Sequence, residues 1–451
     1  MGSLDSGHSP VDTPAASLSG KMVDASIMTA ESVGDGPFYW WRTSGQDLSR
    51  MLIEADYPDE CRRKFLEFYR DTICPLLGGR PEPSSLPAAV GWDGNPFEYS
   101  FEFKGSTKHK VGVRFVLDLS ELRPAKKDRP LDVTTVERVL DVLRERSPMY
   151  DEKWHRDFER WFVYANASPE RQKDLVNRVG IQTPTILGFD INPKILEKAP
   201  GMLPVMVKSY FPPDFAAVDR NLTRFQSLSL GIRQIPDIAS FPNLLHGLRM
   251  IEEYVDDHPQ YHSCGRGMAC DLVPAGIGRL KVYLRYWGRS FDEIWDYYTL
   301  GGRIPGLDDD RDKLREMVEL AHGRDYPASK RRPEAWAERR RRHMFATKPT
   351  SLYFSLTPDT PYPVPKLYFY PAQTAPNDEA IAQGIDAWMA KYGWQDGGKT
   401  LEERVRNVFS HRRLDEKPGI FTFIGIGRKE GSTDLSVQAY VTPELYETPR
   451  Y

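Results

Sequence analysis

Positively charged side chains alternate with apolar ones along four predicted strands, and this alternation limits the fold more than any other feature of the sequence. Residues i and i+2 of a strand share one face of a sheet, so each of these strands has an apolar face and a charged face. The charged faces carry Arg114 on the first strand, Lys208 and Tyr210 on the second, Arg279, Lys281 and Tyr283 on the third, and Lys366 and Tyr368 on the fourth. Any fold of this chain must place these faces either in bulk water or together in a polar interior.

The charged faces have two interpretations. An ordinary half-buried sheet turns its apolar face to the core and its charged face to water, which explains any single strand. The repetition over four strands favours a barrel, in which helices cover the apolar faces while the cations and tyrosines line the interior. Several cations in such an interior repel one another and lose hydration, so they need an anion. A diphosphate group suits them, because Arg donates paired hydrogen bonds, Lys adds a point charge and Tyr donates a hydroxyl.

Hydrophobic periodicity predicts alternating groups of strands and helices along most of the chain. We expect strands at residues 97–103, 111–119, 203–211, 279–286, 367–370, 420–425 and 435–441. We expect helices at residues 65–77, 222–230, 244–254, 291–298, 313–322, 379–392 and 401–409. Strands joined by short turns pair antiparallel, so the helices between successive pairs would lie outside a closed or nearly closed sheet.

The ends of this pattern set the predicted domain organisation. Residues 1–27 are rich in Ser, Asp, Ala and Gly and predict a disordered tail. Residues 28–451 are expected to form one domain. A basic stretch at residues 324–347 interrupts the pattern and is interpreted as a solvated helix or loop, with a nucleic-acid or partner surface as the alternative.

Composition and charge exclude several classes of protein. The formal net charge is -3, so no overall positive field attracts nucleic acid. The four cysteines lack the spacing of a disulfide framework or a zinc site and indicate reduced thiols. No apolar run reaches the ~18 residues that cross a bilayer, and the N-terminus lacks a signal-peptide pattern. We therefore expect a cytoplasmic protein without stable membrane insertion, nucleic-acid partner or bound metal.

Glu98 is the carboxylate that stands out on the first predicted strand, where it follows Asn95-Pro96-Phe97 and has aromatic neighbours. A carboxylate in such a place accepts a hydrogen bond from an indole N–H or a phenol O–H, which raises the electron density of the ring and orients it. An exposed strand glutamate is the simpler alternative. Glu98 is therefore the candidate residue for activating an aromatic molecule.

At these residues the chain resembles the fungal dimethylallyltryptophan synthase family of aromatic prenyltransferases. The resemblance covers about residues 31–441. It is carried by short motifs in a shared order and spacing: Phe38-Tyr39-Trp40-Trp41, Asn95-Pro96-Phe97-Glu98, Val207-Lys208-Ser209-Tyr210-Phe211, Cys270-Asp271-Leu272, Arg279-Leu280-Lys281-Val282-Tyr283, Thr299-Leu300-Gly301-Gly302-Arg303 and Pro365-Lys366-Leu367-Tyr368. The resemblance implies an α+β fold, a ten-stranded antiparallel β-barrel with a solvent-accessible lumen and a surrounding ring of helices, called the ABBA or PT barrel.

The resemblance also implies an enzyme and its site. A prenyltransferase of this family moves an allylic group from a prenyl diphosphate donor to an aromatic small molecule in secondary metabolism, as a monomer or homodimer. By position, Glu98 would anchor and activate the acceptor. The diphosphate would be bound by Arg114, Lys208, Tyr210, Arg279, Lys281, Tyr283, Lys366, Tyr368 and Tyr440.

Two departures from the family pattern bear on the acceptor. Members usually end with two tyrosines four residues apart on the last strand, and here Asp434 and Gln438 stand in their place, with Tyr440 on the same face. The lysine that C4-prenylating tryptophan enzymes carry is absent, and Ile186 lies near its place. Prenylation of free tryptophan at C4 is therefore not expected. Lys366 stands where the family often has glutamine, and both residues donate hydrogen bonds.

The run Asp308-Asp309-Asp310-Arg311-Asp312 matches the DDxxD pattern that binds diphosphate through magnesium in chain-elongating prenyl synthases. Here the acids precede a predicted helix, where negative charge interacts favourably with the helix dipole. The cations of the predicted site already neutralise a diphosphate. We therefore expect that neither Mg²⁺ nor another cofactor is required.

The acceptor class stays open between several hypotheses. We expect an indole acceptor, such as a tryptophan derivative, a cyclic dipeptide or an indole alkaloid, and a donor with a dimethylallyl or longer chain. A phenolic or polycyclic aromatic is the alternative, favoured by the Asp93-Gly94-Asn95-Pro96 segment and the missing tyrosine pair, and a tyrosine acceptor is also open. A non-catalytic barrel for an anionic lipid or nucleotide is the last hypothesis, and Glu98 argues against it because an anion binder gains nothing from a carboxylate there.

Overall fold

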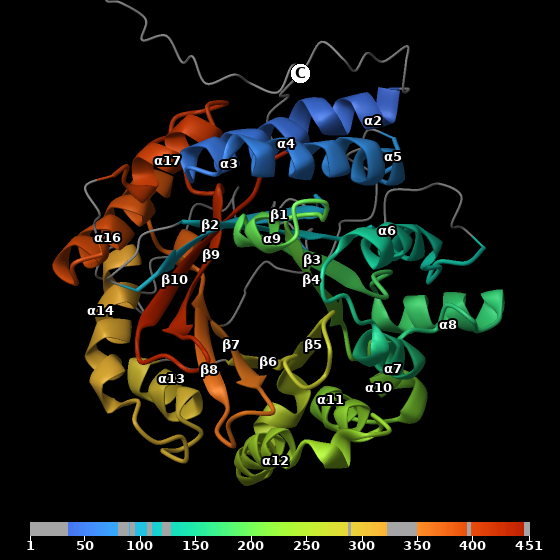
Figure 1. Ribbon diagram of the computed structural model, residues 1–451. Helices are drawn as coiled ribbons and strands as arrows, with labels where there is room; N and C mark the ends of the chain where they lie inside the picture. Colours follow the sequence, from blue (N-terminus) through green and yellow to red (C-terminus); the bar gives the residue numbers. More distant parts are fainter. Residues whose placement is uncertain are drawn as a thin grey trace, which may run out of the picture.

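Ten strands form one closed antiparallel barrel in a computed structural model of the chain (Figure 1). The structure describes residues 35–79, 90, 95–105, 111–119, 128–286, 290–322, 350–394 and 398–445. The tail expected at residues 1–27, the basic stretch at 324–347, and Asp93 with Gly94 lie outside these residues. The strand order around the barrel is β1-β10-β9-β8-β7-β6-β5-β4-β3-β2, which confirms the predicted antiparallel barrel.

Strand bounds agree with most of the predicted ones. The strands are β1 (Phe97–Lys104), β2 (Gly112–Leu117), β3 (Ile186–Ile191), β4 (Val205–Phe211), β5 (Gly265–Asp271), β6 (Leu280–Tyr286), β7 (Thr350–Leu356), β8 (Val364–Phe369), β9 (Phe421–Arg428) and β10 (Leu435–Val441). The sequence pattern does not predict β3, β5 and β7, so the number of strands followed from the family resemblance and not from periodicity.

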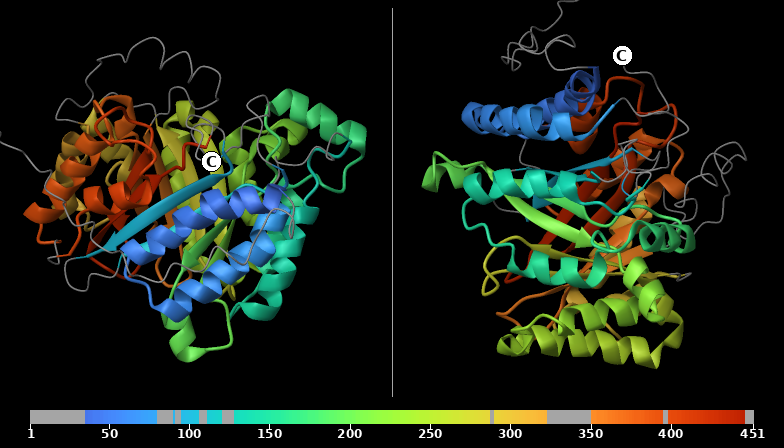
Figure 2. Two further views of the ribbon diagram at one scale, coloured as in Figure 1. Left: turned by 90° about the horizontal axis from the view of Figure 1, so that it is seen from above. Right: turned by 90° about the vertical axis from the view of Figure 1, so that its right-hand side faces the viewer.

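Helices surround the barrel on its outer side (Figures 1 and 2). They are α2 (Asp35–Trp40), α3 (Gln46–Glu54), α4 (Asp59–Phe68), α5 (Cys74–Leu76), α6 (Thr134–Arg146), α7 (Lys153–Phe162), α8 (Pro169–Val179), α9 (Lys194–Lys198), α10 (Asp214–Arg220), α11 (Arg224–Arg233), α12 (Pro242–Asp257), α13 (Phe291–Tyr298), α14 (Arg311–Ala321), α16 (Asp378–Lys391) and α17 (Leu401–Val408). The helix expected at 222–230 begins only at Arg224, because Thr223 caps its N-terminus. Within the described ranges, no helix combines the length and the apolar character that a membrane crossing requires.

The hydrophobic core lies between the barrel and the helices, because one face of each strand points outwards. Phe97 of β1 is fully buried, and its ring centroid lies 5.5 Å from that of Trp40 on α2. Phe115 of β2 and Phe189 of β3 stack with centroids 4.6 Å apart. Glu98 has the opposite parity to Phe97 and therefore points into the barrel. The helices thus cover the apolar faces, as the strand pattern predicts.

Candidate active site

Two chambers inside the barrel share a wall of tyrosines. The large chamber has about 1000 Å³ of non-atom space, which includes open solvent, and is lined by residues that include Glu98, Ile186, Arg266, Met268, Arg285, Tyr370 and Phe423. The small chamber has a volume of about 360 Å³ and is lined by residues that include Ser100, Arg114, Asp190, Lys208, Lys281, Tyr353 and Gln438. Tyr210, Tyr283, Tyr368 and Tyr440 line both chambers. The barrel therefore has a largely apolar compartment beside a charged one.

Glu98 lies on β1 and faces the large chamber. The residue is only 7% exposed, and the hydroxyl of Thr422 donates a hydrogen bond to its Oε1 at 3.3 Å. The alternative of a solvent-exposed strand glutamate is therefore wrong. Tyr370, Phe423 and Tyr440 line the same chamber, so the carboxylate faces a space between aromatic rings.

The cations of the strand alternation converge inside the barrel. Arg114 (β2), Lys208 (β4) and Lys281 (β6) line the small chamber. Lys366 (β8) is buried beside it and donates a hydrogen bond to Gln438 Oε1 at 3.2 Å. The interpretation that places these charged faces in bulk water is therefore wrong.

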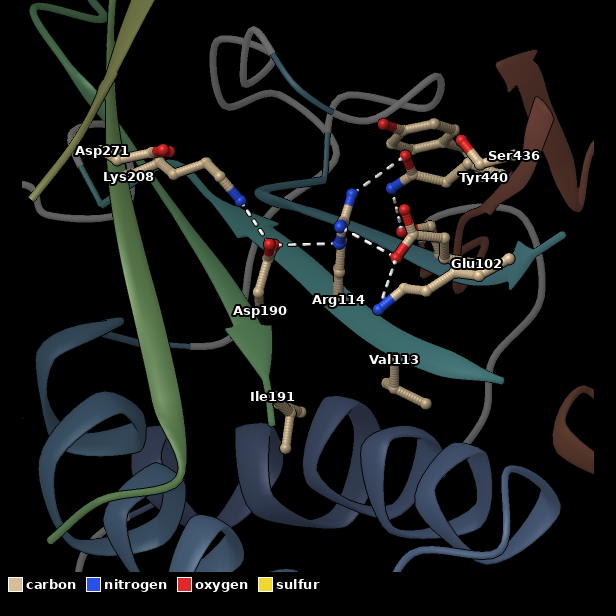
Figure 3. Close-up of polar contacts among 12 residues, drawn as sticks. Glu102, Val113, Arg114, Asp190, Ile191, Lys208, Asp271, Ser436 and Tyr440 are labelled. Atoms are coloured by element: carbon tan, nitrogen blue, oxygen red, sulfur yellow. Dashed lines mark hydrogen bonds and ion pairs between the residues drawn. The ribbon is translucent and has the colours of Figure 1, made fainter. Parts of the chain in front are cut away.

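Carboxylates of the protein lie among these cations (Figure 3). Asp190 of β3 lies 3.0 Å from Arg114 Nε through Oδ1 and forms an ion pair with Lys208 through Oδ2. Glu102 of β1 lies 2.9 Å from Arg114 Nη2 through Oε2. The sequence could have identified Glu102, because it lies on a predicted strand and shares its face with Glu98. Asp190 lies on β3, a strand that the sequence pattern does not predict.

A second group of the same kind lies beside the start of β6. Arg279 Nε lies 2.6 Å from Asp271 Oδ2, and Arg279 Nη1 lies 3.1 Å from Glu430 Oε2. The expectation that the cations depend on an external anion is therefore wrong for Arg114, Lys208 and Arg279, because the protein supplies carboxylates of its own.

Lys281 and Lys366 differ from the other predicted cations. In the part of the chain that the structure describes, neither amine lies within ion-pair distance of a carboxylate. Burial, followed by the charges of Arg279 and Lys208, lowers the pKa of Lys281 well below its usual value. Burial lowers the pKa of Lys366 to about 7, although the charge of Glu102 opposes the shift. These two amines therefore gain most from an anionic ligand, which would stabilise their protonated forms.

Aromatic rings enclose the space between the chambers. The ring centroids of Tyr283 and Tyr353 are 5.3 Å apart, and those of Tyr368 and Tyr440 are 5.8 Å apart. A Cβ atom at Gly425 of β9 would lie 2.8 Å from Cε1 of Tyr368, so only glycine leaves room for this ring. Such π faces attract a cation and leave little space for water.

The two residues that replace the family's tyrosine pair have different places. Gln438 (β10) points inwards, accepts hydrogen bonds from Arg114 Nη1 and Lys366 Nζ at 3.2 Å each, and donates one to Ser100 at 2.9 Å. Asp434 is exposed and precedes β10. Gln438 therefore contributes to the charged compartment, whereas Asp434 does not.

The acidic run after Leu307 belongs to the helix layer. Asp308–Asp310 form a 3-10 turn directly before α14, which is the helix N-terminal position that the sequence predicts. The side chain of Asp310 forms an ion pair with Arg428 and makes no capping hydrogen bond.

Outside the barrel, Glu137 on α6 and His155 with Glu159 on α7 have the composition of a metal site. Arg156 lies 2.7 Å from Glu137 Oε1 and 2.8 Å from Glu159 Oε2 and forms an ion pair with each carboxylate. His155 Nδ1 lies 2.7 Å from Ser209 Oγ of β4. The group is therefore an ion-pair network that fastens α7 to α6 and to the barrel.

Two arginines that the strand pattern leaves out line the large chamber. Arg285 follows Tyr283 by two residues on the same face of β6, and Arg266 lies at an irregularity in the pairing of β5. Burial, followed by the charge of Arg266, lowers the pKa of Arg285 to about 10. The sequence could have identified Arg285, because the alternation of polar and apolar residues on β6 continues beyond Tyr283. Arg266 lies on β5, which the sequence pattern does not predict.

Comparisons with known proteins agree with this geometry. The chain matches the family described as tryptophan dimethylallyltransferase over residues 38–404. It is 56% identical to the DMATS-type prenyltransferase mfmD of Annulohypoxylon moriforme, covering 98% of this chain and 99% of the relative. It is 49% identical to the prenyltransferase phnF of Penicillium herquei, covering 94% of this chain and 95% of the relative.

A solved structure shares the fold at low sequence identity. It is the crystal structure of NotF in complex with brevianamide F and DMSPP, with a TM-score of 0.73 and 18% identity, covering 91% of this chain and 95% of that chain. The family match over most of the sequence and the identity to mfmD together show that the chain belongs to the tryptophan dimethylallyltransferase family and is a DMATS-type aromatic prenyltransferase.

Proposed function

We propose that this enzyme transfers an allylic group, dimethylallyl or longer, from its diphosphate to an aromatic acceptor that carries an acidic hydroxyl group, without a metal ion. The observation that carries the proposal is the large chamber itself, in which Glu98, Arg266 and Arg285 stand among apolar and aromatic walls. The tyrosines that this chamber shares with the small chamber would lie where donor and acceptor meet.

The small chamber suits the diphosphate of the donor. Lys281 and Lys366 would balance its charge, and tyrosine hydroxyls would donate hydrogen bonds to its oxygens. Departure of the diphosphate breaks the bond between C1 of the prenyl chain and oxygen. The tyrosine faces stabilise the resulting allylic cation and shield it from water. The cations of the barrel supply the charge that magnesium would otherwise bring.

The large chamber positions the aromatic ring for attack. The acceptor hydroxyl donates a hydrogen bond to Glu98, which raises the electron density of the ring. A ring carbon then forms the new bond to C1 of the prenyl chain. Transfer of the proton from that carbon to the departing diphosphate restores aromaticity, and inorganic diphosphate is the second product.

Arg266 and Arg285 favour an acceptor with negative charge. The charge of Arg266 lowers the stability of the charge on Arg285 in a partly buried wall, and an anion beside Arg285 removes that cost. Within the described residues, no carboxylate forms an ion pair with Arg285. A second, ionised hydroxyl on a polycyclic ring, separate from the hydroxyl that donates to Glu98, would supply the charge, and the apolar and aromatic walls of the chamber suit fused rings.

An indole that carries a carboxylate is the second candidate acceptor. Its N–H would donate to Glu98 as a phenol does, and its carboxylate would meet Arg266 and Arg285. A neutral cyclic dipeptide brings no negative charge to Arg285 and is therefore expected to be a poor acceptor.

The test is product formation with dimethylallyl and geranyl diphosphate in the presence of EDTA, read by mass. The acceptor panel contains a hydroxylated polycyclic aromatic, a simple phenol, tyrosine, tryptophan and a tryptophan-containing cyclic dipeptide. We expect the hydroxylated polycyclic aromatic to have the highest kcat/KM. Highest activity with the cyclic dipeptide would refute the acidic acceptor, and loss of all activity in EDTA would refute metal independence.

Replacing Arg285 by methionine is expected to raise the KM for an acidic acceptor by about 10- to 100-fold, because a hydrogen bond to a charged group is lost. Inorganic diphosphate should inhibit this variant as it inhibits the parent enzyme, because Arg285 lines only the large chamber. Arg224→Met is the matched control, since Arg224 pairs with Asp214 at 2.6 Å and lines neither chamber. Equal effects of the two substitutions on acceptor KM would contradict the assignment.

Donor binding is expected to weaken as the pH rises above about 7. Burial gives Lys366 a pKa of about 7, and a diphosphate binds the protonated amine. Above this pH the free enzyme loses the proton, so the KM for the donor should rise by up to about tenfold per pH unit. Lys366→Arg keeps its charge over the whole range and should flatten this part of the profile. An identical pH profile in the variant would count against Lys366 as the titrating group.

A further inference from the structure

Asp190 holds two cations of the small chamber in the way that a phosphate group would. Its Oδ1 lies 3.0 Å from Arg114 Nε, and its Oδ2 forms an ion pair with Lys208 Nζ (Figure 3). Burial opposes the ionised carboxyl, but the charges of Arg114 and Lys208 outweigh it and hold the pKa of Asp190 below its usual range. Asp190 is therefore an anion that bridges two of the residues expected to bind the donor diphosphate.

Glu102 has the same relation to the other side of Arg114. Its Oε2 lies 2.9 Å from Arg114 Nη2, its Oε1 lies 3.0 Å from Lys429 Nζ, and the residue is 1% exposed. Figure 3 shows the guanidinium of Arg114 between the two acids. The charge of Arg114 is therefore already shared between two carboxylates, and a diphosphate oxygen that approaches Nε or Nη2 competes with Asp190 and Glu102 for it.

The balance of charge inside the barrel supports competition. The cations are Arg114, Lys208, Arg279, Lys281, Lys366 and Lys429, and the carboxylates that pair with them are Glu102, Asp190, Asp271 and Glu430. With every group charged, these six cations and four carboxylates leave a surplus of two positive charges, and the exposed Lys104 at 3.3 Å from Glu102 adds a third, whereas a prenyl diphosphate carries about three negative charges at neutral pH. The carboxylates therefore weaken the field that holds a diphosphate.

We propose that Asp190 and Glu102 are resident counter-ions of the diphosphate site, which compete with diphosphate for Arg114 and Lys208 and so speed the release of the inorganic diphosphate product. The inference rests on the proposed function, in which the small chamber binds the donor diphosphate. Product release limits the turnover of many enzymes, and a diphosphate held by six uncompensated cations would leave slowly. As the product departs, each carboxylate forms its ion pair again.

A simpler role for the two acids predicts the opposite sign. A carboxylate beside an arginine also holds the guanidinium in place for its ligand. If Asp190 and Glu102 only position Arg114 and Lys208, their neutralisation weakens diphosphate binding. If they are counter-ions, their neutralisation strengthens it, because the cations stay nearby and lose a competitor.

The test is the inhibition constant of inorganic diphosphate in Asp190→Asn and Glu102→Gln, which keep the side-chain shape and remove the charge. We expect the inhibition constant to fall by about tenfold or more in each variant. We also expect the steady-state turnover to fall while the rate of a single turnover stays within a few-fold of the parent. Weaker inhibition in both variants overturns the proposal and leaves a positioning role. Absence of inhibition in the parent enzyme refutes diphosphate binding in the barrel instead, so the two failures are distinguishable.

Asp310→Asn is the matched control, because it removes an acid that is as buried as Glu102 and pairs with Arg428 outside the chambers. Its inhibition constant should equal that of the parent. If a lumen variant is unstable alone, the rise in its melting temperature with inorganic diphosphate replaces the kinetic measurement. That rise should exceed the parent's rise at the same concentration, and an equal or smaller rise overturns the proposal.

Discussion

Replacement of Glu98 by glutamine is expected to lower the rate of transfer to the aromatic acceptor by about 100- to 10,000-fold, the usual contribution of a general base. Glutamine has the same shape but lacks the negative charge that polarises the acceptor O–H or N–H. Glu98 lines the large chamber and not the small one, so donor binding should change little. The measurements are kcat and KM for both substrates, and the inhibition constant of inorganic diphosphate.

Two further observations make this prediction specific. The variant should still release prenyl alcohol slowly, because the donor can ionise without an activated ring to capture the cation. Thr422→Val, which removes only the 3.3 Å hydrogen bond to Glu98, is the matched control and should lower the rate by a few-fold. A Glu98→Gln variant that loses donor binding and transfer to the same extent would show that Glu98 shapes the barrel and does not activate the acceptor.

Replacement of Lys281 by methionine is expected to weaken donor binding by about 10- to 100-fold and to stabilise the folded protein at the same time. The amine of Lys281 is buried near the like charges of Arg279 and Lys208. Each unit by which its pKa is lowered corresponds to about 1.4 kcal/mol of cost for the charged form. Methionine fills a similar volume without that cost, and it removes a positive charge that the diphosphate needs.

The two effects of Lys281→Met are measured separately. Donor affinity is followed by the KM and by protection against thermal unfolding, and stability by the melting temperature without ligand. Lys208→Met is the matched control, since it leaves Asp190 with Arg114 as its remaining partner and should lower the melting temperature. If Lys281→Met destabilises the protein as much as this control does, the amine has a structural partner and is not held for the donor.

The strands that the sequence pattern does not predict have small residues on their inner faces. β3 has Gly188, β5 has Gly267 and Ala269, and β7 has Ser351 and Ser355. Glycine lowers strand propensity, and small polar residues reduce the contrast between the two faces. Gly188 is small because the neighbouring strand carries a tyrosine ring into the same space: a Cβ atom at Gly188 would lie 2.8 Å from a ring carbon of Tyr210.

The site residues also divide into those that lie on predicted strands and those that lie on strands the sequence pattern does not predict. Lys208, Lys281 and Lys366 lie on strands with one apolar face, so parity places them on the opposite face, and the repetition of this pattern over four strands favours the interior. Asp190 and Arg266 lie on strands without that contrast, and no local pattern points to them. The sequence therefore predicts a positively charged interior, whereas the barrel brings carboxylates among the cations.

The sequence by itself determined which side chains share a face, because the period of two along a strand needs only the chain's own geometry. It also determined that the apolar faces must be covered, because burial of apolar surface away from water is favourable. Only the tertiary structure decided which charges meet. Pairing of β2 with β3 sets Arg114 opposite Asp190, and closure of the barrel through β1 and β10 brings Gln438 to the same guanidinium. Electrostatic energy depends on these separations of a few ångströms, and residues distant along the chain acquire them only when the sheet closes on itself.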